Sequence, residues 1–254
     1  MTDESQEFLD SLPELKKGET YAFACHPGVE CFNACCGDLN LMLTPYDVYR
    51  LRKELEKPSR DFIQGYCEVA AAGNAGFPMA QLRMLDNPKR SCPFVRSAGC
   101  SVYGNRPGAC RTYPLGRAAR MANDGSVIEQ YFIVQESHCK GFEEDKQWTS
   151  QEWLADQGME EYNEFNDQYM VLINRFAGLG MQLDAKKLNI AFLALYQLDD
   201  FQQFIRQMKL FDRVLVSEER QAAILADELE ALRFGLDWIE LMLFGESENL
   251  ERKI

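Results

Sequence analysis

Nine cysteines give this 254-residue chain its clearest chemical signal, because all nine lie at or before position 139. An odd number of thiols argues against a closed disulfide framework. Cys31, Cys35 and Cys36 fall within six positions, and buried free cysteines acting as small hydrophobes do not explain such a density. Thiolates are soft ligands that select zinc, Cu(I) or iron–sulfur clusters. The cysteines therefore predict metal binding.

Eight of the cysteines form two groups of candidate metal ligands along the chain. The groups are Cys25, Cys31, Cys35 and Cys36, spaced C-x5-C-x3-CC, and Cys92, Cys100, Cys110 and Cys139. Eight ligands suit two four-coordinate sites, or one cluster with additional structural thiols. Adjacent Cys35 and Cys36 point in different directions on most backbones, so they could serve separate sites or one large cluster. Cys67 stands alone, and we expect it to be a buried thiol in the middle of a helix.

Charge separates the cysteine-rich part from the rest of the chain. The formal net charge is −13, of which residues 1–141 carry −1 and residues 142–254 carry −12. Between Asn87 and Asn123 there is no acid; the cations there are Lys89, Arg90, Arg96, Arg106, Arg111, Arg117 and Arg120. Such a segment could be a basic surface for nucleic acid or another anion. Because cysteines are interleaved with the cations, we favour stabilisation of thiolates by nearby positive charge.

Several side chains beside the cysteines could support a metal site without binding the metal. Arg106 and Arg111 flank Cys110 and could donate hydrogen bonds to sulfur or neutralise thiolates. Tyr103 and Tyr113 are expected to shield the site from water. Both histidines of the chain also neighbour a cysteine: they are His26 and His138. Either histidine could be a ligand, although a polar loop residue is the simpler interpretation.

The cysteine-rich part is expected to be a small α+β domain with a short antiparallel sheet. Thr44 and Pro45 begin a helix that runs to about residue 56, and Ser59 caps a second helix through Cys67. Residues 81–85 resemble a strand. Residues 115–121 and 126–134 form a predicted hairpin across Asn-Asp-Gly at 123–125, which is a strong turn signal. The cysteines then lie on loops and element ends around this sheet.

Residues 143–254 are expected to form an all-α helical bundle with an acidic outer face. Thr149 and Glu152 form a capping box that opens a helix to about residue 177. Asp184 opens the next helix, Asp199 or Asp200 a third one to about residue 212, and Ser217 a long last helix. An aromatic stripe at helical spacing predicts a buried face; its residues are Tyr162, Phe165, Tyr169 and Phe176. The fold class is therefore α+β, with domains at 1–142 and 143–254.

Three segments of the sequence resemble motifs of a known family. Residues 43–51 (LTPYDVYRL), the string Arg106-Pro-x-x-Cys110-Arg-x-Tyr-Pro114 after Cys92-Pro-Phe, and Cys139-Lys-Gly141 are similar to motifs of the YkgJ-like, CxxCxxCC-type family of zinc- or iron-chelating domains. The resemblance covers roughly residues 21–142, and the gaps before Cys31 and Cys35 are longer here than in the family's first motif. It implies a metal-binding domain, and some relatives are flagellin lysine methylases associated with an iron–sulfur cluster.

Together the residues and the resemblance predict an intracellular protein that holds an iron–sulfur cluster, of 4Fe–4S type, or zinc. A cluster is favoured slightly, because only Cys31 and Cys35 have the short spacing of zinc knuckles. The alternatives are a cluster-dependent protein-modifying enzyme resembling the lysine N-methylases and a zinc-stabilised interaction module. No P-loop, His-Glu-x-x-His or Gly-x-Ser-x-Gly motif identifies catalytic residues, so enzymatic activity stays open.

The expected surroundings of the protein follow from its composition. The acidic start, Met-Thr-Asp-Glu-Ser-Gln-Glu, lacks the basic and apolar regions of a signal peptide, which predicts the cytoplasm. No apolar run approaches the roughly 18 residues of a membrane span. We expect no nucleic-acid partner, and the helical region could bind another protein.

Overall fold

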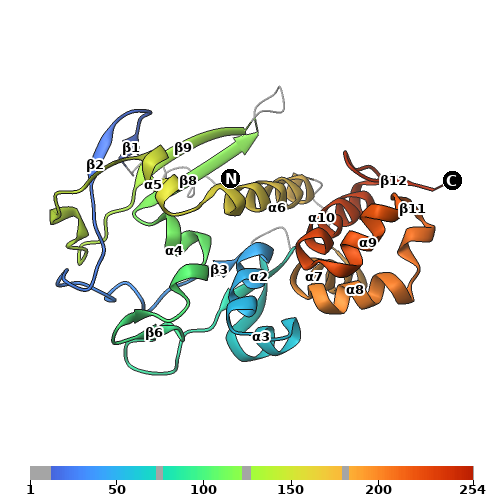
Figure 1. Ribbon diagram of the computed structural model, residues 1–254, viewed down its shortest axis with the longest axis horizontal. Helices are drawn as coiled ribbons and strands as arrows, with labels where there is room; N and C mark the ends of the chain where they lie inside the picture. Colours follow the sequence, from blue (N-terminus) through green and yellow to red (C-terminus); the bar gives the residue numbers. More distant parts are fainter. Residues whose placement is uncertain (1–12, 73–76, 122–126, 179–182, 254) are drawn as a thin grey trace. The chain divides into compact units, whose positions relative to one another are not determined.

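The computed structural model describes residues 13–72, 77–121, 127–178 and 183–253. Its helices are α2 (Pro45–Glu54), α3 (Ser59–Tyr66), α4 (Gly108–Thr112), α5 (Ser150–Asp156), α6 (Glu160–Gly178), α7 (Ala185–Tyr196), α8 (Leu198–Gln207), α9 (Glu218–Ala226) and α10 (Glu228–Phe244). Its strands are β1 (Glu14–Leu15), β2 (Thr20–Ala22), β3 (Met42–Leu43), β4 (Cys67–Ala72), β5 (Phe77–Leu82), β6 (Val95–Arg96), β7 (Gly99–Cys100), β8 (Leu115–Met121), β9 (Val127–Ile133), β10 (Gln147–Thr149), β11 (Val214–Leu215) and β12 (Glu251–Arg252). The fold class is α+β, as predicted (Figure 1).

In the described part of the chain, no helix has the length and apolar character needed to cross a membrane.

Contacts divide the chain into two compact units that interleave along the sequence. Unit 1 contains residues 1–41 and 84–164, and unit 2 contains residues 42–83 and 165–254. The division falls inside α6, whose first turn belongs to unit 1. It differs from the division at residue 142 that charge and cysteine content indicate, which stays a prediction. Unit 1 holds the eight candidate ligands, and Cys67 lies in unit 2.

Unit 1 is built on short antiparallel sheets. Strands β8 and β9 form the predicted hairpin, with Leu115 opposite Ile133, and β1 pairs with the other edge of β9 (Figure 1). Its predicted Asn-Asp-Gly turn lies outside the described residues. Strand β10 pairs with β2, and β6 with β7. These pairings bring residues 14–22 beside residues 127–149, which allows cysteines distant in sequence to approach one another.

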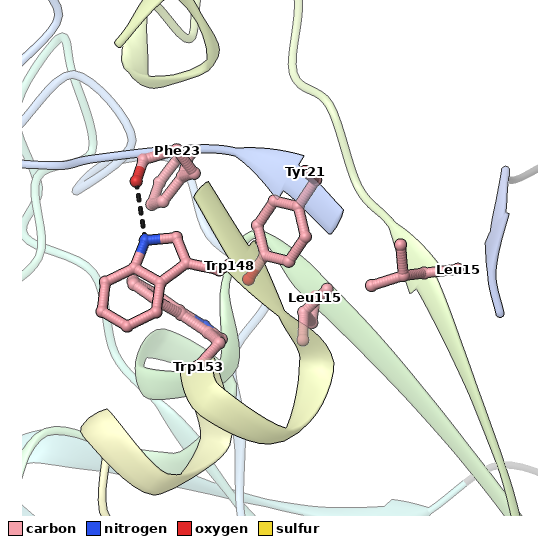
Figure 2. Close-up of a cluster of buried hydrophobic side chains, with 6 residues drawn as sticks. All are labelled: Leu15, Tyr21, Phe23, Leu115, Trp148 and Trp153. Atoms are coloured by element: carbon pink, nitrogen blue, oxygen red, sulfur yellow. Dashed lines mark hydrogen bonds between the residues drawn. The ribbon is translucent and has the colours of Figure 1, made fainter. Parts of the chain in front are cut away.

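An aromatic core holds unit 1 together just behind two cysteine-bearing segments. Figure 2 shows its buried members, which are Leu15, Tyr21, Phe23, Leu115, Trp148 and Trp153. The indole nitrogen of Trp148 donates to the carbonyl of Phe23 at 2.9 Å, and that of Trp153 donates to the carbonyl of Thr112 at 2.9 Å. Burying indole rings is favourable only when their N–H groups find acceptors, so both rings are fixed in orientation. The segments leading to Cys25 and from Cys110 are thereby anchored.

Unit 2 packs helices around the small sheet β3–β5–β4. Helix α2 begins with a complete capping box between Thr44 and Asp47, as the Thr-Pro start predicts. A buried pair of hydroxyls joins α6 to α7, with 2.7 Å between the oxygens of Tyr169 and Tyr196, and Tyr196 donates to the carbonyl of Leu43 at 3.1 Å. All four members of the predicted aromatic stripe are buried, which confirms that it is core.

Several predicted helices end or break where backbone geometry overrides the apolar pattern. The stretch after Thr149 is two helices, because Gly158 takes a left-handed φ of +60° between α5 and α6. The last helix is likewise divided, since Asp227 is extended and caps α10. Ser59 is the first residue of α3 rather than its N-cap, which is Pro58. Cys67 is buried, as expected, but it ends α3 and begins β4 instead of lying within a helix.

Other predicted boundaries were shifted rather than wrong in type. The strand expected at residues 81–85 is β5, which begins earlier and ends at Leu82. Thr149 caps α5 through a full capping box, Asp184 caps α7 and Ser217 caps α9, as predicted. The third helix starts at Leu198 with Gln197 as its N-cap, and it stops at Gln207 before a short 3₁₀ turn at Leu210–Asp212.

Replacing Gly235 by alanine should destabilise unit 2. An added Cβ at this position in α10 would lie 2.6 Å from the backbone oxygen of Ala194 in α7. A backbone oxygen cannot rotate away, so the helices must separate, and we expect a loss of about 1–3 kcal/mol of unfolding free energy. Urea denaturation followed by circular dichroism measures the change. Gly65→Ala in α3 is the matched control, because its Cβ would meet nothing within 4 Å. Equal stability of the two variants would contradict the close approach.

Candidate metal centre

Four thiols line one small pocket in unit 1. They are Cys25, Cys31, Cys35 and Cys139, which we call the first thiol group. The cavity between them has a volume of about 30 Å³, and its other walls include Val29, Tyr113 and His138. No carboxylate is among the lining residues, so the described donors to a bound metal would be sulfur and the histidine ring. This donor set suits zinc or an iron–sulfur cluster.

Local backbone turns point the first three sulfurs of the group toward the pocket. After β2, the amide of Ala24 donates to the carbonyl of Gly141 at 3.0 Å, which places Cys25 beside the segment of Cys139. Successive turns then carry the chain from Cys25 to Cys36, and Asn33 within them has a φ of +67°. A left-handed φ at a residue with a side chain is uncommon and occurs where the surroundings require it. These turns contain the residues that separate Cys25 from Cys31 and Cys31 from Cys35.

In the protein without a metal, burial and the neighbouring thiols disfavour the ionisation of Cys25. Burial, followed by the charges of the other three thiols, raises the pKa of Cys25 to about 11. The amide of Lys140 donates to the sulfur of Cys31 at 3.1 Å. A buried thiol whose ionisation is disfavoured by three neighbouring thiols is in an environment that a bound cation relieves. The donor chemistry therefore fits a metal.

Cys35 and Cys36 interact directly although they are adjacent in sequence. The Cys36 thiol donates a hydrogen bond to the Cys35 sulfur, and this bond is the first cause that lowers the pKa of Cys35 to about 6. The electrostatic interaction with His138 also lowers the pKa of Cys35. For Cys36 the same bond, its burial and the neighbouring thiolates raise the pKa strongly. In the protein alone, the pair therefore shares one proton that stays on Cys36.

A second set of thiols gathers around Cys36. The charges of Cys92 and Cys110 act on Cys36, and the charge of Cys100 acts on Cys92. We call Cys36, Cys92, Cys100 and Cys110 the second thiol group. The amide of Cys92 donates to the carbonyl of Cys36 at 2.9 Å, and an isolated β-bridge joins Gly37 to Ser91. Cys100 lies on β7 and Cys110 on α4, so four separate elements supply this group.

The backbone after Cys92 is folded around its sulfur. Burial raises the pKa of Cys92, and the amides of Phe94 and Val95 oppose this by donating to the sulfur. Amides two and three residues after a cysteine, directed at its sulfur, stabilise the thiolate that a metal requires. Pro93 directly follows Cys92, and its ring restricts the backbone at the start of this turn. Because burial outweighs these amides in the protein alone, Cys92 would lose its proton when a cation binds.

The grouping in space differs from the grouping in sequence at two positions. Cys139 joins the thiols of the first motif, and Cys36 joins those of the later motif. The two adjacent cysteines thus belong to different groups, which is one of the two arrangements left open by the sequence. Among the residues that the structure describes, no set of three or more His, Cys, Asp or Glu side chains is already arranged as a metal site. Ligation by the eight thiols stays a prediction.

The two arginines beside Cys110 make different contacts from those expected of them. Arg106 donates to the carbonyl of Tyr103 at 2.7 Å and to the side chain of Gln157, and its guanidinium lies 3.8 Å from the centre of the Tyr103 ring. Arg111 donates to the carbonyls of Gly104 and Gln157. These hydrogen bonds go to oxygen and not to sulfur. Arg106 still acts electrostatically on the thiols, because the charges of Cys100 and Cys110 interact with it.

The histidines and tyrosines beside the cysteines have distinct roles. His26 is exposed and uses both ring nitrogens, accepting from the amide of Gly28 at 3.1 Å and lying 3.2 Å from the Glu144 carboxylate. It is a loop residue, the simpler of the two interpretations. His138 lines the pocket of the first thiol group. Tyr103 is 59% exposed and shields nothing, whereas Tyr113 lines the pocket.

Three structural features of the site carry no side-chain signal in the sequence. The amide of Lys140 reaches the sulfur of Cys31, and Gly37 and Gly141 permit close backbone approaches. A Cβ at Gly37 would lie 2.7 Å from the carbonyl oxygen of Lys89, and one at Gly141 would lie 2.7 Å from that of Ala24. For Gly37, the sequence offers one indication of a close backbone approach, which is a glycine directly after the pair Cys35-Cys36.

Comparison with known proteins supports the cysteine-rich segment as a family domain. Residues 24–146, a little under half of the chain, match the family model CxxCxxCC, described as "Putative zinc- or iron-chelating domain". The resemblance found in the sequence is thereby confirmed, and this segment is similar to the zinc- or iron-chelating domain that the model describes. No curated protein and no solved structure matches the chain. The choice between zinc and an iron–sulfur cluster is not made by the match.

In the metal-free protein, Cys35 should be the first cysteine to be alkylated. It is exposed and its pKa is about 6, so it is largely thiolate at pH 7 and above, and its reaction rate should rise between about pH 5 and 7 and then level off. Cys25, with a pKa of about 11, should react only at high pH. Short pulses of iodoacetamide followed by peptide mass spectrometry measure the order. Cys67 is the buried control and should stay unlabelled; faster labelling of Cys25 than of Cys35 at pH 7 would refute the prediction.

Gly141→Ala should weaken unit 1 where Cys139 meets Cys25. The added Cβ would lie 2.7 Å from both the oxygen of Ala24 and a ring carbon of Phe23, and this would break the hydrogen bond between Ala24 and Gly141. We expect a loss of about 1–3 kcal/mol of unfolding free energy, measured by urea denaturation of the metal-free protein. Gly104→Ala is the control in the same unit, because its Cβ has open space. Identical unfolding of the two variants would show that the approach is not required.

Proposed function

We propose that this protein binds iron as an iron–sulfur cluster through the first thiol group. The observation that carries the proposal is the shared pocket, in which thiols from residues 25–35 and from Cys139 face one another without a carboxylate. Four thiolates are the ligand set of [2Fe–2S] and [4Fe–4S] clusters. A bound cluster would supply one-electron redox chemistry.

The chain's own residues would prepare the pocket for this ligand. Val29, Phe23 and Ala24 give one side of it an apolar wall, which limits the access of water. The Lys140 amide donates to the Cys31 sulfur and would orient it, and Cys35 is already ionised near neutral pH. Cys25 resists ionisation in the protein alone and would lose its proton when the cation arrives.

The second thiol group supports a separate candidate function, which is structural binding of zinc. The turn Cys92-Pro93-Phe94-Val95 directs two amides at one sulfur, an arrangement suited to a tetrahedral thiolate site. Zinc there would connect β7, α4 and the segments of Cys36 and Cys92. Because Cys36 stands beside Cys35, this cross-link would also hold the first thiol group in place. A protein partner bound through the helices, or modification of a protein substrate, would then be an additional activity.

Metal analysis of the protein purified without oxygen tests both proposals. We expect a coloured protein containing iron, sulfide and zinc. Cys139→Ser should remove most of the visible absorption, iron and sulfide, while Cys110→Ser should remove zinc. Cys67→Ser is the matched control, since this thiol is buried in unit 2, and it should retain all three.

Two results would overturn these assignments. A colourless protein with stoichiometric zinc and no iron would exclude the cluster. Loss of metal in Cys67→Ser, with full retention in Cys139→Ser and Cys110→Ser, would refute the two thiol groups.

A further inference from the structure

Tyr113 has a hydroxyl that the protein alone does not fully use. Its Oη is buried and has no hydrogen-bond partner of full geometry in the described part of the chain. Buried hydroxyls are paired in most structures, because an unpaired one costs about 1–3 kcal/mol. A buried hydroxyl without a hydrogen bond of full geometry therefore indicates an acceptor nearby whose charge or position changes when a ligand binds.

The position of Tyr113 shows where this partner would lie. The residue lines the pocket of the first thiol group, together with Cys139 and Cys35. Burial, then hydrogen bonding with Cys139 and the charges of Cys139 and Cys35, raise the pKa of the hydroxyl, while the amide of Glu136 opposes this. The hydroxyl thus faces the interior of the candidate cluster site rather than the aromatic core.

The ring of Tyr113 is held in place by its surroundings. Its centre lies 5.9 Å from that of Phe23 in an edge-to-face contact, and its amide donates to the carbonyl of Ala109 at 3.3 Å at the end of α4. Pro114 follows, and its carbonyl accepts from Val134 at 2.8 Å in the hairpin of β8 and β9. The hydroxyl cannot move far to find an acceptor elsewhere.

We propose that the Tyr113 hydroxyl donates a hydrogen bond to the Cys139 sulfur when the first thiol group holds its cluster, and that this bond raises the cluster's reduction potential. The inference rests on the proposed function. Reduction adds negative charge that the ligand sulfurs share, so a donor at sulfur stabilises the reduced state more than the oxidised state. Tyrosine is a donor at neutral pH because its ordinary pKa is about 10. Tyr113 is therefore a positioning and tuning residue and not a ligand.

Tyr21 provides a matched control within the same core. Its hydroxyl is also buried and without a hydrogen-bond partner among the described residues, and it packs in the aromatic core of unit 1 (Figure 2). Unlike Tyr113, it is not among the residues that line the pocket. Tyr21→Phe and Tyr113→Phe therefore remove the same atom from similar surroundings, and they differ only in the neighbouring thiols.

Redox titration of the two variants tests the inference. The purified proteins are reconstituted with ferrous iron and sulfide without oxygen, and iron and sulfide are measured before the titration. At the wild-type midpoint, Tyr113→Phe should lower the ratio of reduced to oxidised cluster about tenfold, which for one electron is a shift of about 59 mV to lower potential. Tyr21→Phe should leave the midpoint unchanged. Both variants keep the ring, so both should fold and retain their iron.

The outcomes separate this inference from the proposed function. If the wild-type protein retains no iron and sulfide, the proposed function fails. If iron is retained and Tyr113→Phe titrates like wild type, or Tyr21→Phe shifts as far as Tyr113→Phe, the inference fails alone. Pulsed EPR of the reduced cluster in deuterium oxide gives a second measurement. Wild type should show one more strongly coupled exchangeable deuteron than Tyr113→Phe, and equal numbers would also refute the hydrogen bond.

Discussion

The hydrogen bond from the Cys36 thiol to the Cys35 sulfur couples the ionisation of the two thiol groups. It joins two sets of thiols that disfavour one another's ionisation, and it does so with a single proton. Without a cation, the pair can ionise only once, and Cys35 takes the charge. A metal in either group would replace this proton as the source of positive charge, so the two groups cannot be independent in their ionisation. The two adjacent cysteines matter here because Cys35 lies in the first thiol group and Cys36 in the second, and not because both would bind one metal.

This division requires backbones that approach closely on both sides of the pair. On one side, Gly37 lies against the carbonyl of Lys89, and the strand-like contact of Gly37 with Ser91 brings Cys92 to Cys36. On the other side, Gly141 lies against Ala24, which brings Cys139 to Cys25. Phe23 of the aromatic core lies against Gly141, so the core supplies apolar burial that stabilises the second of these approaches. The thiols themselves contribute little to this, because their charges repel.

Much of the fold could be predicted because it depends on local chemistry. The capping boxes of Thr44 and Thr149 and the pairing of β8 with β9 follow from short motifs. The breaks at Gly158 and Asp227 could not be predicted, because apolar periodicity continues across them while the backbone leaves the helical region. The exchange of Cys36 and Cys139 between groups was also hidden, since spacing along the chain does not report which loops meet.

The hydrogen-bond donors to the cysteine sulfurs also could not be predicted from the sequence. Arginines near Cys110 were natural candidates, yet Arg106 and Arg111 hold carbonyls and Gln157, and so connect α4 and the loop of Tyr103 to the end of α5. The donors that reach sulfur are backbone amides, those of Lys140 at Cys31 and of Phe94 and Val95 at Cys92. Every residue except proline has such an amide, so no sequence pattern identifies it. Charge in the acid-free segment thus acts at a distance, while the short-range electrostatics of the thiols are set by the path of the main chain.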